Sequence, residues 1–122
     1  MNCLLDTHLL LWAAADTLPE RAASYIADEA NTLYFSPASI WEIVIKAGLG
    51  RDDFKVNPSL LYQGLLSAGY VDLPVTTEHA LGAENLPDIH KDPFDRILLA
   101  QAIEEHLTLL TADTALGQYK GP

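Results

Sequence analysis

The chain alternates short apolar runs with longer segments that begin at a capping residue or a proline. The apolar runs predict buried strands at residues 4–5, 33–35, 70–73 and 107–110. The longer segments predict helices at residues 8–15, 19–30, 37–47, 58–68, 77–82 and 94–106, with a last helical turn at 112–116. Because strands and helices alternate, we expect an α/β fold, with a central parallel sheet of four to five strands and helices on both faces.

Capping signals mark several helix starts. Ser36-Pro37 and Asp92-Pro93 each place a capping side chain before a proline at the first helical position. Asp6-Thr7 directly follows the first predicted strand and has the pattern of a cap for the next helix. In open parallel sheets, ligands bind beyond the carboxyl ends of the strands, so residues that follow a strand are the first candidates for a functional site.

Length and composition indicate one compact domain over residues 1–122. Of the 122 residues, 49% are hydrophobic, which is enough to build a core. No apolar run reaches the roughly 18 residues that a membrane span needs, and Asp6 stands where a signal peptide would be basic or apolar. The lone Cys3 excludes an internal disulfide and a zinc–cysteine cluster. We therefore expect a cytoplasmic protein that does not contact membranes.

The charge balance is strongly acidic. Seven basic and 17 acidic residues give a formal net charge of −10, and the basic residues are spread along the chain. This distribution argues against tight nucleic-acid binding by charge alone, which normally needs a basic stripe. Most of the acids are explained by a solvated surface. A few of them can hold divalent metal ions, which attract phosphate, or can attract a basic protein partner.

Two aspartates follow predicted strands at opposite ends of the chain. Asp6 follows the first strand, and Asp113 follows the last. Since parallel strands present their carboxyl ends at one edge of the sheet, we expect these carboxylates to converge there. Capping of the following helix explains each aspartate about equally well, because Asp is among the best N-cap residues.

Glu42 interrupts the apolar segment 40–45, which predicts a buried helix. An unpaired buried carboxylate costs several kcal/mol or shifts its pKa until it is neutral. Lys46 stands four residues further on, so a helical ion pair is the alternative explanation. When exposed, such a pair contributes only about 0.3–0.5 kcal/mol, which favours a functional role for Glu42.

Asp92 and Asp95 lie three residues apart at a predicted helix start, so both can face the same edge. For Asp92, capping is the favoured explanation. Gathering Asp6, Glu42, Asp95 and Asp113 without compensation would cost about 4 kcal/mol for each like-charge pair about 4 Å apart at an effective dielectric of 20. Such a set therefore implies bound cations or protonation, and oxygen-only ligands indicate Mg²⁺ or Mn²⁺.

Taken together in this order, these residues resemble the PIN-domain ribonucleases, specifically the VapC-like toxins of prokaryotic toxin–antitoxin pairs. The resemblance spans nearly the whole chain and is carried by five segments: Leu4-Leu5-Asp6-Thr7-His8, Ser36-Pro37-Ala38-Ser39-Ile40-Trp41-Glu42-Ile43, Leu86-Pro87, His90-Lys91-Asp92-Pro93-Phe94-Asp95-Arg96 and Leu109-Leu110-Thr111-Ala112-Asp113. It maps the family's acidic positions onto Asp6, Glu42, Asp95 and Asp113, and it matches Asp92 to a further acid of the subgroup.

The resemblance implies Mg²⁺-dependent endonucleolytic cleavage of RNA that leaves a 3′-hydroxyl and a 5′-phosphate. Typical substrates of such toxins are structured RNAs such as tRNA. It also implies a homodimer and a cognate antitoxin, whose basic tail places an Arg or Lys in the acidic pocket. The net charge of −10 is suited to such a partner. The chain departs from the family in one respect: residues 118–122 contain no apolar run. The sequence therefore does not decide whether the sheet has a fifth strand.

Three residues beside the proposed ligands are candidates for supporting roles. Thr7 and Thr111 can hold a carboxylate or a metal-bound water, with local capping as the alternative. Arg96 can contact a substrate phosphate, although an ion pair with Asp92 or Asp95 is favoured slightly.

Other fold-level interpretations are weaker. A phosphoacceptor receiver domain needs an acidic pair and a Lys after the last strand, whereas the only late lysine is Lys120. A haloacid-dehalogenase-type phosphatase needs Asp two residues after its nucleophile, where this chain has His8. A non-catalytic PIN-like binding module is the alternative from a different class, and the presence of all four acids argues against it.

Overall fold

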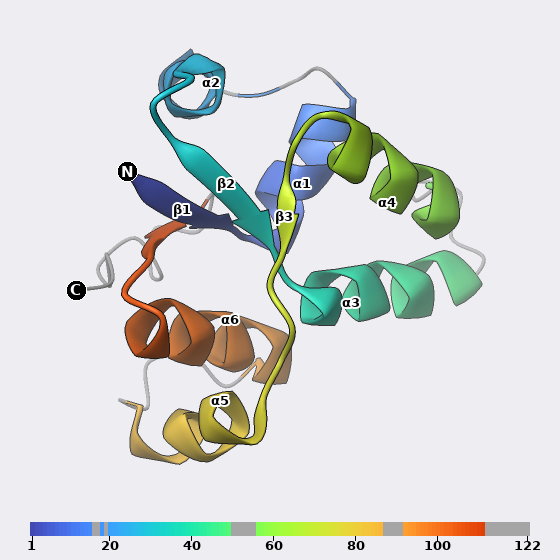
Figure 1. Cartoon of the computed structure of the whole chain (residues 1–122). Coiled ribbons are helices and arrows are strands. Elements are labelled where there is room, and N and C mark those ends of the chain that lie inside the picture. The colour runs from blue at the N-terminus through green and yellow to red at the C-terminus, as the bar shows by residue number, and fades with distance from the viewer. Residues whose placement is uncertain (16–17, 19, 50–55, 87–91, 112–122) are drawn as a thin grey trace.

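The computed structural model describes residues 1–15, 18, 20–49, 56–86 and 92–111 (Figure 1). Within these ranges four strands form one sheet: β1 (Asn2–Leu5), β2 (Thr32–Phe35), β3 (Val71–Asp72) and β4 (Thr108–Leu110). All pairings are parallel, and the strand order is β3-β2-β1-β4. The predicted α/β fold with a parallel sheet is therefore confirmed. The helical turn predicted at 112–116 and the segment that would form a fifth strand lie outside the described residues.

The helices follow the predicted alternation. They are α1 (Thr7–Ala14), α2 (Glu20–Ala27), α3 (Pro37–Gly48), α4 (Pro58–Ser67), α5 (Thr77–Gly82) and α6 (Pro93–Glu104), and the short 3-10 helix η1 (Ala83–Asn85) follows α5. Ser36 and Asp92 cap α3 and α6 as predicted. No helix within the described ranges has the length and apolar character needed to cross a bilayer.

Two helices end at least two residues earlier than predicted, whereas α1 and α4 end one residue early. Helix α2 stops at Ala27 rather than at residue 30, because the Asp28 side chain accepts a hydrogen bond from the backbone N–H of Ala30 (2.9 Å) and forms a turn. Helix α6 stops at Glu104 rather than at residue 106, because His106 adopts a left-handed conformation (φ 57°). That conformation lets the Leu107 N–H reach back to the carbonyl of Ala102 at 2.8 Å.

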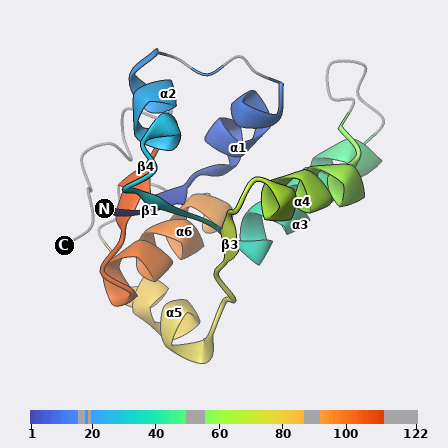
Figure 2. The same ribbon diagram turned by 45° about the horizontal axis from the view of Figure 1, so that its top comes forward.

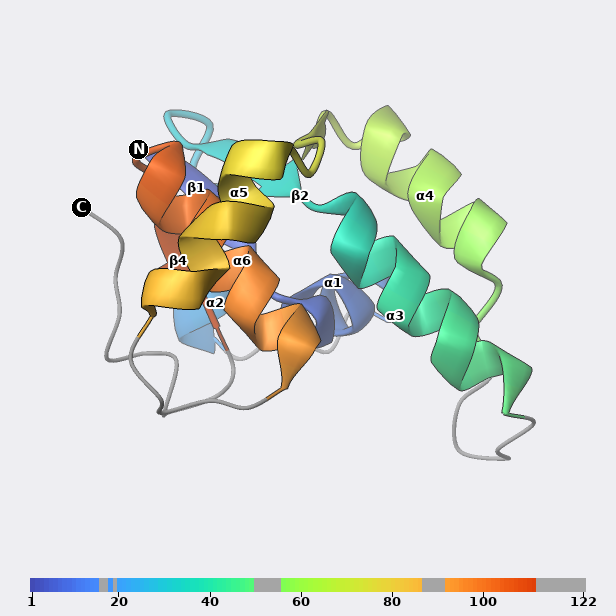
Figure 3. The ribbon, with the colours of Figure 1, turned by 90° about the horizontal axis from the view of Figure 1, so that it is seen from below.

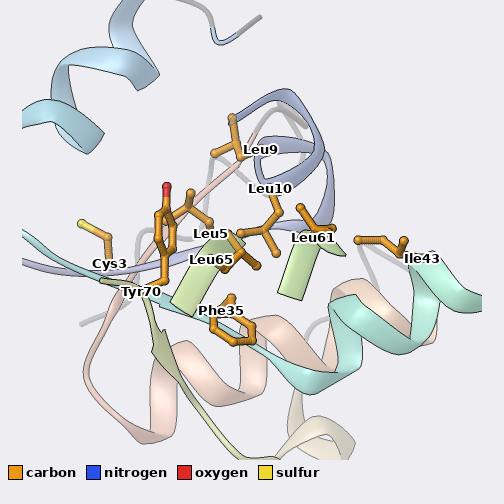
Figure 4. Close-up of a cluster of buried hydrophobic side chains, with 9 residues drawn as sticks. All are labelled: Cys3, Leu5, Leu9, Leu10, Phe35, Ile43, Leu61, Leu65 and Tyr70. Atoms are coloured by element: carbon orange, nitrogen blue, oxygen red, sulfur yellow. The ribbon is translucent and has the colours of Figure 1, made fainter. Parts of the chain in front are cut away.

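The two faces of β1 build two separate cores, as expected for a strand buried on both sides. Cys3 and Leu5 point to one face, where they join side chains of α1 and α4 such as Leu10 and Leu65 (Figure 4). Leu4 points to the opposite face and packs with α6. Cys3 is fully buried, and this burial raises the pKa of its thiol.

The helices divide between the two faces accordingly. Helices α5 and α6 lie together on one side of the sheet, and α1 and α2 lie on the other (Figure 2). Helix α3 contacts α1, α4 and α6, and it runs beside α4 (Figure 3). The chain adds β2 and β3 on one side of β1 and then places β4 on the other side. Ligand sites of open α/β sheets lie beyond the carboxyl ends of the strands at such a reversal.

Candidate active site

Asp6 lies at the carboxyl end of β1, beside β4, where the strand order reverses. It is the N-cap of α1: its Oδ1 accepts a hydrogen bond from the backbone N–H of Leu9 at 2.8 Å. Its Oδ2 accepts a second hydrogen bond, from the hydroxyl of Thr111 at 2.5 Å. Asp6 is only 3% exposed. The capping alternative is thus correct for Asp6, but it accounts for only one of the two carboxylate oxygens.

Thr111 connects the end of β4 to the end of β1. The backbone N–H of Asp6 donates to the carbonyl of Leu110 at 3.0 Å, which extends the pairing of the two strands by one step. The Thr111 hydroxyl then reaches the Asp6 side chain. Backbone and side chain together fix the Asp6 carboxylate at the edge of the sheet.

Glu42 is held by partners from two helices. Its Oε2 forms an ion pair with Lys46 at 2.8 Å, so the helical pair offered as an alternative does form. Its Oε1 accepts a hydrogen bond from the Thr7 hydroxyl of α1 at 2.7 Å. Although Glu42 is only 7% exposed, both of its oxygens are therefore satisfied. The contact with Lys46 offsets part of the cost of burying the carboxylate.

The hydroxyl groups of Ser39 and Thr7 form a hydrogen-bonded chain that ends at Glu42. The Thr7 oxygen lies 3.0 Å from the hydroxyl oxygen of Ser39, which is fully buried. Since Thr7 has one hydroxyl proton and donates it to Glu42, Ser39 donates to Thr7. Thr7 follows Asp6 directly, so α1 carries one candidate acid itself and fixes the other through the Thr7 hydroxyl.

The start of α6 carries the next two predicted residues. Asp92 is the exposed N-cap, and its Oδ1 accepts from the backbone N–H of Phe94 at 2.8 Å. Asp95 is half-buried in the first turn. The Arg96 guanidinium donates to the carbonyl of Ala83 at 2.7 Å, which ties α6 to η1. Asp92 therefore caps its helix as favoured above.

The donor types at this edge fit a hard cation, since Asp6 and Glu42 offer only carboxylate oxygens. Within residues 1–15, 18, 20–49, 56–86 and 92–111, however, no three His, Cys, Asp or Glu side chains come together as a metal-binding group. Asp113, the fourth predicted acid, lies outside the described residues. The structure thus joins Asp6 and Glu42 through the start of α1, and the four-acid set stays a prediction.

Comparison with known proteins identifies the family. A family model described as "PIN domain" matches residues 3–122. The chain belongs to the PIN-domain family. It is 31% identical over 123 residues to Ribonuclease VapC22 of Mycobacterium tuberculosis, and the match covers 98% of this chain and 92% of the relative. The predicted resemblance to VapC-like PIN ribonucleases is therefore confirmed.

Solved structures support the fold of this PIN domain. A chain of "VapBC2 from Rickettsia felis bound to a DNA fragment from their promoter" matches with a TM-score of 0.70 at 16% identity, covering 98% of this chain and 93% of that chain. A chain of VapBC-1 from nontypeable Haemophilus influenzae matches with a TM-score of 0.53 at 15% identity, covering 100% and 97%. At these identities the likeness shows a shared fold.

Sequence reasoning missed Ser39 as part of this PIN-domain site. Ser39 precedes Glu42 by three residues on α3, so the two share a helix face. That spacing was the available signal, because a small polar residue beside a buried acid often completes its hydrogen bonds.

Proposed function

We propose that this PIN domain is a metal-dependent endoribonuclease and the toxin of a toxin–antitoxin pair. The observation that carries the proposal is a pair of buried carboxylates. Asp6 lies where the strand order reverses, and Glu42 accepts a hydrogen bond from the next residue, Thr7. Family membership and the name of the mycobacterial relative, a ribonuclease, support the reaction class. The candidate ligands are Asp6, Glu42, Asp95 and Asp113, and the metal ion is Mg²⁺ or Mn²⁺.

A bound divalent ion of this kind supplies charge stabilisation at a phosphodiester and lowers the pKa of a water molecule. The chain's own residues prepare the carboxylates for that role. Thr111 donates to one oxygen of Asp6, and the backbone N–H of Leu9 donates to the other. These two hydrogen bonds orient the carboxylate, whose oxygens are ligands of the kind that Mg²⁺ binds.

Thr7 and Lys46 do the same for Glu42. The Thr7 hydroxyl orients Oε1, while the Lys46 ammonium lies 2.8 Å from Oε2. Lys46 thereby places a positive charge beside the acid in the absence of a metal ion. We infer that Lys46 and Thr7 hold Glu42 in the orientation in which it would bind a divalent cation.

The proposed substrate is structured RNA such as tRNA, which places the activity in the cytoplasm. The proposed partner is a cognate antitoxin with a basic inhibitory tail, and the active form is a homodimer. The net charge of −10 supports a basic protein partner. The two solved neighbours, both VapBC proteins, also support an antitoxin partner.

The deciding experiment incubates the purified chain, freed of any partner, with total RNA and either Mg²⁺ or Mn²⁺. Cleavage should require the metal, stop on addition of EDTA and be lost in Asp6→Asn and Asp95→Asn. Glu29→Gln is the matched control, because Glu29 is exposed near the amino end of β2, and its substitution removes one negative charge there. Equal cleavage by wild type and both aspartate variants would refute the site.

The alternative, a non-catalytic PIN-like binding module, predicts a different outcome. The wild-type chain would then cleave no RNA with either metal, while still recovering a small partner on co-purification. Recovery of no basic partner would contradict the toxin interpretation but would leave a nuclease intact.

A further inference from the structure

A small pocket at the carboxyl ends of β2 and β3 is lined by side chains of both α3 and α4. Its volume is about 300 Å³, and its lining residues are Phe35, Pro37, Ile40, Trp41, Tyr62 and Asp72. Of these six, Asp72 alone carries a charge, and no Lys or Arg within the described residues lines the pocket. We call it the aromatic pocket; its lining is apolar except for one carboxylate, that of Asp72.

One oxygen of the Asp72 carboxylate lacks a donor among the described residues. Asp72 ends β3 and pairs in register with Phe35, so its side chain lies on the sheet face that α3 and α4 cover. Its Oδ1 is buried and has no hydrogen-bond partner among the described residues. A buried carboxylate oxygen without a donor is costly, and this cost falls when a ligand brings an N–H group to it.

Aromatic rings form the exposed wall of the pocket. Trp41 is 63% exposed, an unusual degree for a tryptophan, and Tyr62 is 38% exposed. Each ring is steadied by an edge contact with a phenylalanine: Trp41 lies 5.4 Å from Phe94, and Tyr62 lies 5.9 Å from Phe35, between ring centroids. Exposed, fixed rings beside a carboxylate are the elements that bind planar cations.

We propose that the aromatic pocket binds the guanidinium group of an arginine side chain in a basic segment of a partner protein. The planar guanidinium stacks on the aromatic wall while its N–H groups donate to Asp72. Charge complementarity selects this occupant, because the chain carries −10 and the one charged residue lining the pocket is Asp72. A nucleotide fits less well, since its phosphate would lie near Asp72 with no basic residue among the described lining.

None of the residues that line the aromatic pocket is a candidate metal ligand. Trp41 and Glu42 are adjacent in α3 but lie on different faces of the helix, since Trp41 is exposed and Glu42 is buried against α1. An arginine in the aromatic pocket therefore contacts the face of α3 that carries Trp41 and leaves Asp6 and Glu42 untouched. The proposal does not depend on nuclease activity.

The test is a two-dimensional NMR titration of the full-length chain with the peptide acetyl-Gly-Arg-Gly-amide. The probe signal is the indole N–H of Trp41, which is assigned by its loss in Trp41→Phe. We expect the arginine peptide to shift this signal, and we expect the same peptide with citrulline, a neutral isostere, not to shift it. Asp72→Asn should weaken binding about tenfold.

Glu29→Gln is again the matched control, because it changes the net charge by the same amount at an exposed position far from the pocket. Its affinity for the peptide should equal that of the wild type. Equal weakening in Glu29→Gln and Asp72→Asn would overturn the proposal, since only the overall charge would then matter. Tyr62→Leu provides a second variant if Asp72→Asn fails to fold, and it should also weaken binding.

Two further outcomes would overturn the assignment. If GMP shifts the Trp41 signal at concentrations where the arginine peptide does not, the pocket is a nucleobase site. If the Trp41 signal shifts with protein concentration alone, and sedimentation shows a dimer over the same range, a second copy of the chain covers the pocket.

Discussion

The starts of α1 and α6 carry the same local signal, an aspartate N-cap, in different surroundings. Asp92 is exposed, and the hydrogen bonds to its Oδ1 come from its own helix, from the N–H groups of Phe94 and Asp95. Asp6 is buried, and only one of its oxygens is used by α1. The other is bound by Thr111, which is 105 positions away in the chain.

The difference shows what a cap explains and what it does not. Capping is worth about 0.5–2 kcal/mol and needs neither burial nor a second partner. The burial of Asp6 and its fixation from a neighbouring strand need another reason, and a role in binding a cation supplies one. Asp92 needs no explanation beyond the cap.

The largest expected effect is on catalysis. Asp6→Asn should lower RNA cleavage more than about a hundredfold, because the amide loses the charge that holds a cation while keeping an oxygen for the cap. Asp92→Asn should change cleavage far less, as it also keeps its cap. The measurement is the initial rate of cleavage of a defined RNA at saturating Mg²⁺. A comparable loss in both variants would break the comparison and make Asp92 a ligand.

Removal of the hydroxyl that fixes Asp6 should have the next largest effect. Thr111→Val keeps the shape of the side chain but removes the hydroxyl that donates to Oδ2 of Asp6. Loss of such an orienting contact typically costs about 10–100-fold in metal affinity or activity. The Mg²⁺ concentration for half-maximal cleavage is the sensitive measurement. Thr32→Val, at an exposed position of β2, is the matched control and should leave that concentration unchanged.

Removal of the exposed Asp92 cap tests whether capping alone explains Asp92, in contrast to Asp6. Asp92→Ala should lower the free energy of unfolding by about 1 kcal/mol, because the N–H of Phe94 loses its partner, while Asp92→Ser should retain most of it. Urea unfolding followed by circular dichroism measures both. A loss several times larger in Asp92→Ala would show that Asp92 has a tertiary partner, as Asp6 has.

The sequence was informative where the signals are local. Proline-marked caps located α3 and α6, and the alternation of strands with helices was enough to predict the parallel sheet, because these depend on near neighbours and on simple packing rules. The ends of α2 and α6 were misplaced because a side-chain turn at Asp28 and the left-handed backbone of His106 ended them early. Neither residue carries a strong breaker signal.

The side-chain contacts at the candidate active site, in contrast, could not be predicted from the sequence. The sequence leaves two roles open for the Thr7 hydroxyl, holding a carboxylate or capping locally. The packing of α1 against α3 brings this hydroxyl to Glu42, to which it donates. The sequence likewise gave no sign of the unpartnered oxygen of Asp72, since its burial depends on β2, α3 and α4 together. Residue types select candidates, while long-range packing decides which candidates meet.

The smallest expected effect concerns a third helix start, that of α5, where Thr76 is the cap and Glu78 is fully exposed. Hydrogen bonds from its own backbone N–H and from the Thr76 hydroxyl hold the pKa of Glu78 below its ordinary value of 4.5. The resulting stabilisation is present above pH 4.5 and is lost as the pH falls through the lowered pKa. Glu78→Gln should therefore flatten the decline of unfolding free energy below pH 4.5 relative to the wild type. Because Glu78 is exposed, the difference in pH dependence between the wild type and Glu78→Gln should shrink in high salt. A difference that persists in high salt would show that Glu78 is shielded from solvent, as Asp6 is.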